Sequence, residues 1–280
     1  MSNQSRAEEL LTALINGEEV EIEPRSRAEK YLNNCIKKCG CDDLPTPRTR
    51  IEALYYQLAE QLAGGGGSGE STDTLKALLD KTKSAYYLFN NYNGTNIDGL
   101  ISYNTTSNVT NMSNMFYICN NLTSVPLLDT SNVTNMSNMF GGCTNLTSVP
   151  LFDTSNVTDM YNMFGGCTNL TSVPLLDTSN VTNMKRMFYG CRALTTVKLQ
   201  GISSKITSSS NWFYTCTSLE LIDFRGATGV PTLSSTDAFT NVPSTCKVVI
   251  PDDLYDTWTN ATNWSAISVT WVKESEYMEE

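Results

Sequence analysis

The residues of this sequence that have the chemistry to form a reactive or metal site are its cysteines and aspartates. The 280 residues include nine cysteines and no histidine. Without histidine the chain has no Ser–His or Cys–His couple and no imidazole metal ligand. Cys35, Cys39 and Cys41 offer three thiols, but a structural zinc site needs four ligands, usually at other spacings. We interpret these cysteines as incidental residues at a helix end, and we predict no metal site and no cofactor.

Aspartate forms the second candidate group. Asp129, Asp153 and Asp177 recur in D-T-S turns. Stacked carboxylates of this kind can bind calcium. Aspartate in a turn also accepts hydrogen bonds from the backbone two residues later, and we favour this interpretation. No isolated carboxylate pair stands out in the repeat, so the sequence predicts a protein that is not an enzyme.

Composition excludes two further classes of protein. The net charge is −10 and only 17% of the residues are charged, which argues against a nucleic-acid binder because phosphate contacts need clustered Lys and Arg. No apolar run reaches the length of about 18 residues that a membrane helix needs, so we predict no membrane insertion. The acidic N-terminus is not typical of a secretory signal.

An internal repeat positions the cysteines. Cys119, Cys143, Cys167 and Cys191 are spaced 24 residues apart, and Cys216 follows after 25. This spacing indicates a structural repeat rather than a disulfide pattern, so we expect reduced, buried thiols. The pattern N-V-T-x-M-x-x-M-F-x-x-C-x-x-L occurs complete four times, and a looser copy follows it. The complete copies begin at Asn108, Asn132, Asn156 and Asn180.

The first half of each copy has apolar residues that fit one face of a short helix or helical turn. In the first copy these are Val109, Met112, Met115, Phe116 and Cys119. One copy of about 24 residues cannot bury its apolar faces alone, but stacked copies can. We therefore expect columns of Met, Phe and Cys in a shared core.

The second half of each copy predicts a strand. Leu122-x-x-Val125-x-Leu127 has leucine-rich-repeat spacing, in which alternate side chains point inward. A proline within each of three predicted strands removes a hydrogen-bond donor, so we expect a narrow parallel sheet. These prolines are Pro126, Pro150 and Pro174.

The sequence of the copies, DTSNVTNMSNMFGGCTNLTSV, resembles the BspA-like leucine-rich repeats of bacterial surface and phage-encoded proteins. The resemblance covers roughly residues 100–250. It implies a solenoid and an adhesive or binding role.

The predicted fold class is therefore an α+β repeat. It is a leucine-rich-repeat solenoid with short parallel strands and helical turns, preceded by a small all-helical N-terminal segment. The expected parts are a helical anchoring segment (1–62), a Gly/Ser linker (63–72), an N-terminal cap of the solenoid (73–103), the repeat array (104–246), and a C-terminal cap and tail (247–280).

The N-terminal segment contains three capping boxes, which begin at Ser5, Ser26 and Thr49. This pattern before a glycine run resembles the anchoring segments of phage tail, baseplate or head-fibre proteins. The resemblance implies a capsid, tail or baseplate protein as partner of residues 1–62. The anchoring residues would be Arg6, Arg27, Tyr31, Arg50, Tyr55 and Tyr56.

A basic and aromatic group late in the array is the candidate ligand-binding site. It consists of Tyr161, Lys185, Arg186, Tyr189, Arg192, Trp212 and Tyr214. Aromatic rings stack on sugar faces, and Arg and Lys pair with acidic groups. The alternative is ordinary solvated surface.

These features together predict a non-enzymatic phage virion protein, attached by its N-terminal helices, whose solenoid binds a host-surface glycan or protein. The alternatives are a bacterial cell-surface adhesin and a virion decoration that binds no ligand. Formation of a homo-oligomer stays open, because the sequence has no coiled-coil heptads.

Overall fold

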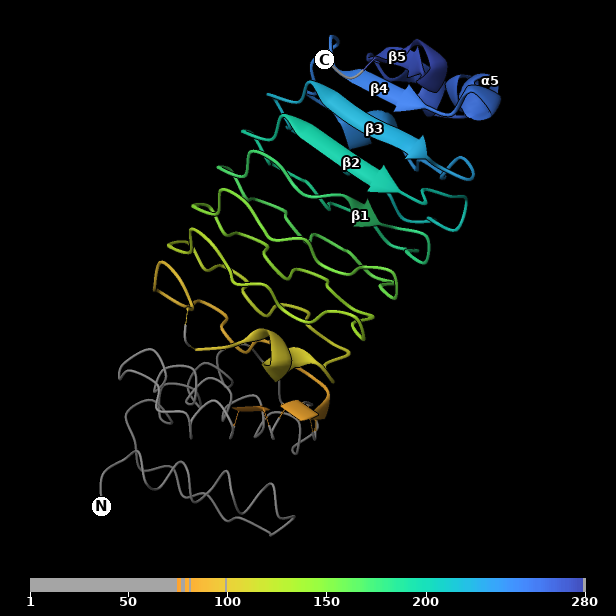
Figure 1. Cartoon of the computed structure of the whole chain (residues 1–280). Coiled ribbons are helices and arrows are strands. Elements are labelled where there is room, and N and C mark those ends of the chain that lie inside the picture. The colour runs from red at the N-terminus through yellow and green to blue at the C-terminus, as the bar shows by residue number, and fades with distance from the viewer. Residues whose placement is uncertain (1–74, 77–78, 81, 99, 279–280) are drawn as a thin grey trace, which may run out of the picture.

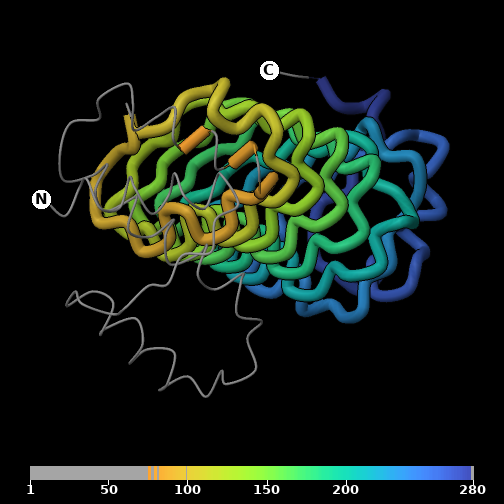
Figure 2. The backbone as a smooth tube through the Cα atoms, turned by 90° about the horizontal axis from the view of Figure 1, so that it is seen from below, coloured from red at the N-terminus to blue at the C-terminus, as the bar shows by residue number. Residues whose placement is uncertain are grey.

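The computed structural model describes residues 75–76, 79–80, 82–98 and 100–278. Within them, coils of chain stack into an elongated solenoid (Figure 1). A view from below shows successive coils lying over one another (Figure 2). The predicted linker and anchoring segment fall outside the described residues, as do Cys35, Cys39 and Cys41. The six predicted anchoring residues are also outside: Arg6, Arg27, Tyr31, Arg50, Tyr55 and Tyr56.

A five-stranded parallel sheet, in sequence order, forms one wall of the C-terminal half. Its strands are β1 (Leu176–Asp177), β2 (Thr196–Gln200), β3 (Leu221–Gly226), β4 (Lys247–Ile250) and β5 (Thr270–Lys273). Parallel pairing of successive strands one coil apart confirms the repeat solenoid. We call this side of the coils the strand wall.

Helical structure is sparse in the described residues. The 3-10 helices are η1 (Tyr103–Thr106), η2 (Thr236–Phe239), η3 (Asp252–Leu254), η4 (Trp264–Ala266) and η5 (Glu274–Glu276), and α5 (Tyr255–Thr259) is α-helical. Residues 75–76, 79–80 and 82 are α-helical as well. Most of the labelled helices lie at the C-terminal end, where their aromatic side chains cover the last coils.

The sheet is shorter than the sequence predicts, because the proline coils lack regular strands. In residues 100–175 only isolated bridges precede β1. Ser172 pairs with Thr196, but Leu176 pairs with Leu199, so the coil containing Pro174 has one residue more than β2 over the same stretch. Such an extra residue is a bulge, and proline favours it because it has no N–H to donate.

This extra residue reverses the direction of one leucine in each proline coil. Leu127, predicted to point inward, is 49% exposed, whereas Leu128 is 1% exposed. The prediction for Leu127 is therefore wrong, and the next two coils repeat the pattern. The outward residues are Leu127, Leu151 and Leu175, and the inward residues are Leu128, Phe152 and Leu176.

We call the opposite side of each coil the turn wall. The sequence predicts a short helix or helical turn there, but the chain does not form a helix. The amide of Met112 donates to the carbonyl of Asn135 in the next coil at 2.9 Å, whereas the amide of Met115 donates back to Met112 at 3.2 Å. Asn114 and Ile118 have left-handed φ values of 57° and 61°. Two left-handed residues in each coil break the chain into tight turns, because a right-handed helix cannot include them.

The predicted core columns are confirmed. Val109, Met112, Met115, Phe116 and Cys119 are all 0% exposed, and their equivalents in later coils are buried as well. Apolar burial of this kind is the main favourable contribution to folding. Each coil therefore depends on its neighbours for stability.

Phenylalanine forms a continuous stack through the core. Phe116 and Phe140 have ring centroids 5.4 Å apart and planes 6° apart. The same geometry repeats from Phe140 to Phe164 at 5.6 Å and from Phe164 to Phe188 at 5.6 Å. Offset ring pairs at these distances add about 0.5–1.5 kcal/mol beyond the area that they bury.

Candidate binding surfaces

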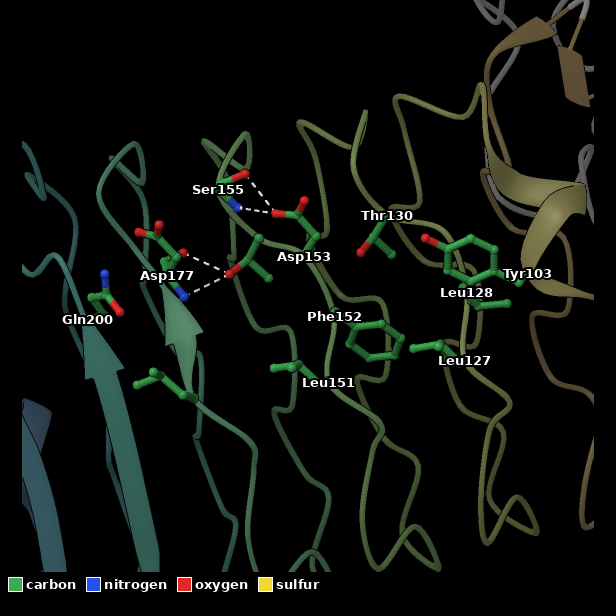
Figure 3. A pocket seen from close by; sticks show the side chains of 12 residues that line it. Tyr103, Leu127, Leu128, Thr130, Leu151, Phe152, Asp153, Ser155, Asp177 and Gln200 are labelled. Carbon is green, nitrogen blue, oxygen red and sulfur yellow. Dashed lines mark hydrogen bonds between the residues drawn. The ribbon is translucent and has the colours of Figure 1, made fainter.

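A groove of about 350 Å³ runs along the strand wall where the proline coils turn toward their aspartates. Its outer edge is a column of three leucines, Leu127, Leu151 and Leu175, which are 49%, 62% and 49% exposed. Tyr103 of η1 lines it at one end and Gln200 of β2 at the other (Figure 3). We call this feature the leucine groove.

The bulge explains why the groove exists. Each proline coil turns one leucine outward and places the next residue in the core. Phe152 forms part of the groove floor, and its ring packs on the core ring of Phe140 with centroids 5.9 Å apart. A concave site lined mainly by aliphatic and aromatic side chains, with a few polar groups, is the usual composition of a binding site.

Asp153 and Asp177 of the same coils form the polar rim of the groove. Asp153 Oδ1 accepts hydrogen bonds from the Ser155 amide at 3.0 Å and from the Ser155 hydroxyl at 2.7 Å (Figure 3). Asp129 makes the same pair of bonds with Ser131 at 3.1 and 2.7 Å. These are Asx turns, as the sequence favours. The Ser155 hydrogen bonds lower the pKa of the Asp153 carboxyl, which is therefore charged at neutral pH.

The aspartate column does not form a metal cluster. Among the described residues, no three His, Cys, Asp or Glu side chains lie close enough to hold a metal ion. The Asx turns therefore account for these aspartates in structural terms.

One hydroxyl in the groove wall differs from its equivalents. The Thr154 hydroxyl donates to the Asp177 carbonyl and accepts from the Asp177 amide, both at 2.8 Å. The Thr178 hydroxyl donates to the Gln200 carbonyl at 2.8 Å. The Thr130 hydroxyl is buried but has no such partner among the described residues. The bonding pattern along the groove is therefore incomplete at its Tyr103 end.

The predicted basic and aromatic site lies on the turn wall, and the structure brings part of it together. Tyr189 and Tyr214 stack with ring centroids 5.2 Å apart and planes 5° apart. The Arg186 guanidinium lies 5.4 Å from the centre of the Tyr189 ring. We call Arg186, Tyr189 and Tyr214 the tyrosine patch.

The other predicted residues of that site are placed differently. Trp212 is 0% exposed, so its inclusion in a binding surface is wrong. It packs on the Phe224 ring at 5.6 Å, because it occupies the core column that methionine fills in earlier coils. Tyr161 and Lys185 are half-buried in one column of adjacent coils, and Arg192 is exposed.

The repeat cysteines Cys119, Cys143, Cys167, Cys191 and Cys216 form a column without reactive chemistry. They are free and buried, as predicted, and Cys246 outside this column is free and buried as well. The Cys143 thiol donates to the Phe116 carbonyl of the preceding coil at 3.0 Å, and the Cys167 thiol does the same to Phe140 at 3.1 Å. Burial raises the pKa of Cys167 to about 12. A buried neutral thiol is a poor nucleophile and a poor metal ligand.

Comparison with known proteins gives one family. Residues 83–195 and 123–222 match the family described as Mycoplasma protein of unknown function, DUF285. The two overlapping matches together extend from residue 83 to residue 222, which is half of the 280-residue chain. The chain belongs to the DUF285 family. This family is associated with BspA-like repeat proteins, which agrees with the resemblance of the repeats. A search of curated proteins finds no match.

The DUF285 part of the chain contains both candidate surfaces. The leucine groove reaches from Tyr103 to Gln200 and the tyrosine patch from Arg186 to Tyr214, so both lie within the matched residues. In the described part of the chain, no helix has the length and apolar character needed to cross a bilayer.

Sequence reasoning missed the leucine groove. A signal for it exists in the repeat. In V-P-L-[LF]-D, the segment between the valine and the turn has one residue too many for side chains that simply alternate between inward and outward. Two adjacent apolar residues after a proline cannot both point inward.

Proposed function

We propose that this DUF285 protein is a non-enzymatic binding protein whose solenoid presents the leucine groove to a macromolecule on a host-cell surface. The observation that carries this proposal is the exposed column of Leu127, Leu151 and Leu175 beside charged aspartates. Exposed apolar residues that form a contiguous patch with a polar rim mark interaction sites more often than chance. Single scattered leucines would carry no such argument.

The geometry of the array supports binding rather than catalysis. The groove repeats one chemical motif, an outward leucine and an aspartate two residues later, in three successive coils. Repeated identical contacts suit adhesion, in which many weak interactions add along one partner.

We extend the proposal to a setting on a phage virion, with residues 1–62 attaching the chain to a capsid, tail or baseplate protein. This extension is supported only by the sequence of the N-terminal capping boxes and the glycine run that follows them. The alternatives are a bacterial surface adhesin and a decoration without a ligand. Mass spectrometry of purified particles tests the extension: the chain should be present in stoichiometric amounts, and its absence from particles would refute the virion setting.

Binding of the fluorescently labelled full chain to host cells tests the main proposal. We expect saturable binding by the parent chain and at least tenfold weaker binding by a variant carrying Leu127→Ser, Leu151→Ser and Leu175→Ser. The substituted side chains are 49–62% exposed, so the variant should melt at the temperature of the parent.

A control variant on the turn wall carries Tyr189→Ser and Tyr214→Ser. We expect it to bind cells as the parent does. If the tyrosine variant loses binding and the leucine variant retains it, the binding surface is the tyrosine patch and the assignment of the groove is wrong. Absence of saturable binding by the parent chain would refute the proposed function itself.

A further inference from the structure

We propose that the occupant of the leucine groove is an amphipathic α-helix of a partner protein, with apolar residues on the face toward the leucines and Lys or Arg along the flank toward the aspartates. This inference rests on the proposed function, because it names the chemistry of the partner at the same site.

The spacing of the coils favours a helix. Successive coils of a parallel stack are about 4.8 Å apart, so the three leucines repeat at about that interval. A helix returns to the same face every 5.4 Å, which differs from the coil spacing by only about 0.6 Å per step. An extended peptide repeats its side chains on one face about every 6.7 Å, so it loses register by about 2 Å per step. Apolar residues at i, i+3 or i+4, and i+7 therefore fit between the leucines.

The length of the groove sets the length of the helix. From the coil of Leu127 to the coil of Gln200 there are three coil steps, which is roughly 14 Å at the spacing of a parallel sheet. At 1.5 Å per residue, about ten helical residues cover that distance. Tyr103, 47% exposed, bounds the first coil and gives an aromatic face for the end of the helix.

The charge of the groove favours a basic partner. Asp153 and Asp177 line the groove two residues after Leu151 and Leu175, so two carboxylates lie beside the apolar column. No Lys or Arg is among the described residues that line the groove. Each aspartate is oriented by the Asx turn through Oδ1, and at Asp129 and Asp153 no described residue donates to Oδ2. Lys and Arg side chains reach such a flank while their stems cover apolar surface.

The Thr130 hydroxyl is a second, independent indication that the groove binds an occupant. It is a buried polar group without a partner, at the point where Thr154 and Thr178 each have one. A buried hydroxyl left unpaired is unfavourable. If the Thr130 side chain rotates toward the groove, a polar group of an occupant at the Tyr103 end would supply the missing hydrogen bond.

Three synthetic peptides of 14 residues test this inference by fluorescence anisotropy with the full chain. The first contains leucine at helical spacing with lysine elsewhere, the second has glutamate in place of every lysine, and the third is the lysine peptide with two central prolines that prevent a helix. We expect saturable binding of the lysine peptide alone.

Two pairs of chain variants locate the binding. We expect Asp153→Asn with Asp177→Asn to weaken binding of the lysine peptide by about tenfold, because each exposed charge pair contributes up to about 1 kcal/mol. Asparagine keeps the Asx acceptor, as Asn111 and Asn135 do on the turn wall. Asp253→Asn with Asp256→Asn, which removes the same charge from the C-terminal end, should change binding less than twofold.

Several results would overturn the inference. Equal binding of the glutamate peptide would refute charge complementarity, and equal binding of the proline peptide would refute the helix. Equal weakening by both aspartate pairs would show attraction to the net charge of the chain instead of to the groove. If no peptide binds while cell binding still depends on the three leucines, the helical occupant is wrong and the proposed function stands. If cell binding does not depend on the three leucines either, both the helical occupant and the assignment of the binding function to the groove are wrong.

Discussion

The buried thiol column makes the stability of this solenoid sensitive to alkali, and the structure gives the size of the effect. Burial raises the pKa of Cys167 and of Cys216 to about 12, from an ordinary value of 9.0. Both thiols stay protonated in the folded chain at pH 10, whereas they ionise when the chain unfolds. Because the folded pKa is the higher one, stability is complete below about pH 9 and is lost as the pH rises toward 12.

The expected loss follows from proton linkage. One pH unit above the unfolded pKa, each such thiol lowers the free energy of unfolding by about 1.4 kcal/mol. Cys167 and Cys216 together then account for about 3 kcal/mol between pH 7 and pH 10. This is a large fraction of the 5–15 kcal/mol that typically stabilises a folded domain.

The perturbation that isolates this contribution is Cys167→Ser with Cys216→Ser. A serine hydroxyl does not ionise in this range, and it can still donate to the carbonyls of Phe140 and Phe188, which now accept from the thiols at 3.1 Å. Other groups titrate in both proteins, so the informative quantity is the difference between the two pH-dependent losses.

Urea unfolding at pH 7 and pH 10, in a phosphine reductant, measures the free energy of unfolding of both proteins. We expect the parent to lose about 3 kcal/mol more than the double variant over this interval. Equal losses would refute the reasoning, because they would mean that these thiols are accessible to water or already ionised in the folded chain.

Three further single substitutions and one double substitution test other parts of the structure. Phe164→Ala removes a ring from the middle of the core stack and should cost about 3–5 kcal/mol in urea unfolding; a cost below 1 kcal/mol would contradict the stack. Ile118→Gly should raise the free energy of unfolding by about 1 kcal/mol, because this β-branched residue has a φ of 61° at a position that later coils fill with glycine; a destabilised variant would contradict it. Asp153→Asn should change the free energy of unfolding by less than about 0.5 kcal/mol, since asparagine forms the same Asx turn; a larger loss would show that the charge supports the fold. Arg186→Ala with Arg192→Ala should leave the melting curve unchanged, and the same variant tests the turn wall in the cell-binding assay. A lower melting temperature would show that these two side chains stabilise the fold.

The core of this fold could be predicted from the sequence because its residues are apolar and recur in every complete copy. Val109, Met112 and Phe116 have equivalents in every complete copy, and stacking is the only arrangement that buries all of them. The reduced thiols follow from the same argument, since a 24-residue period places Cys119 and Cys143 in one column. The identity of the columns does not depend on whether the chain between them is helical.

The local backbone was harder to predict for a specific physical reason. The spacing of Met112, Phe116 and Cys119 suits a helix, but Asn114 and Ile118 take left-handed conformations and divide the segment into turns. A signal for this is present, because the first position is asparagine, and the second position is glycine in the following three coils. Both residue types tolerate positive φ.

The candidate site was missed because a single proline changes which side chain faces the core. Strict alternation assigns Leu127 to the interior, but the bulge at Pro126 assigns Leu128 instead. Trp212 shows the opposite error. Its aromatic character suggests a surface stack, but the 25-residue step from Met187 places it in a core column.

Residue-level footprinting by photochemical carbene labelling and mass spectrometry tests the central claim most directly, in the free chain and in the chain bound to host cells. The structure predicts that Leu127, Leu151 and Leu175 are labelled in the free chain and protected in the bound chain, while Leu122 and Leu146 stay unlabelled in both. Strong labelling of Leu122 and Leu146 in the free chain would contradict the stacked architecture. Unchanged labelling of the three groove leucines on binding would contradict the function that we assign to the groove.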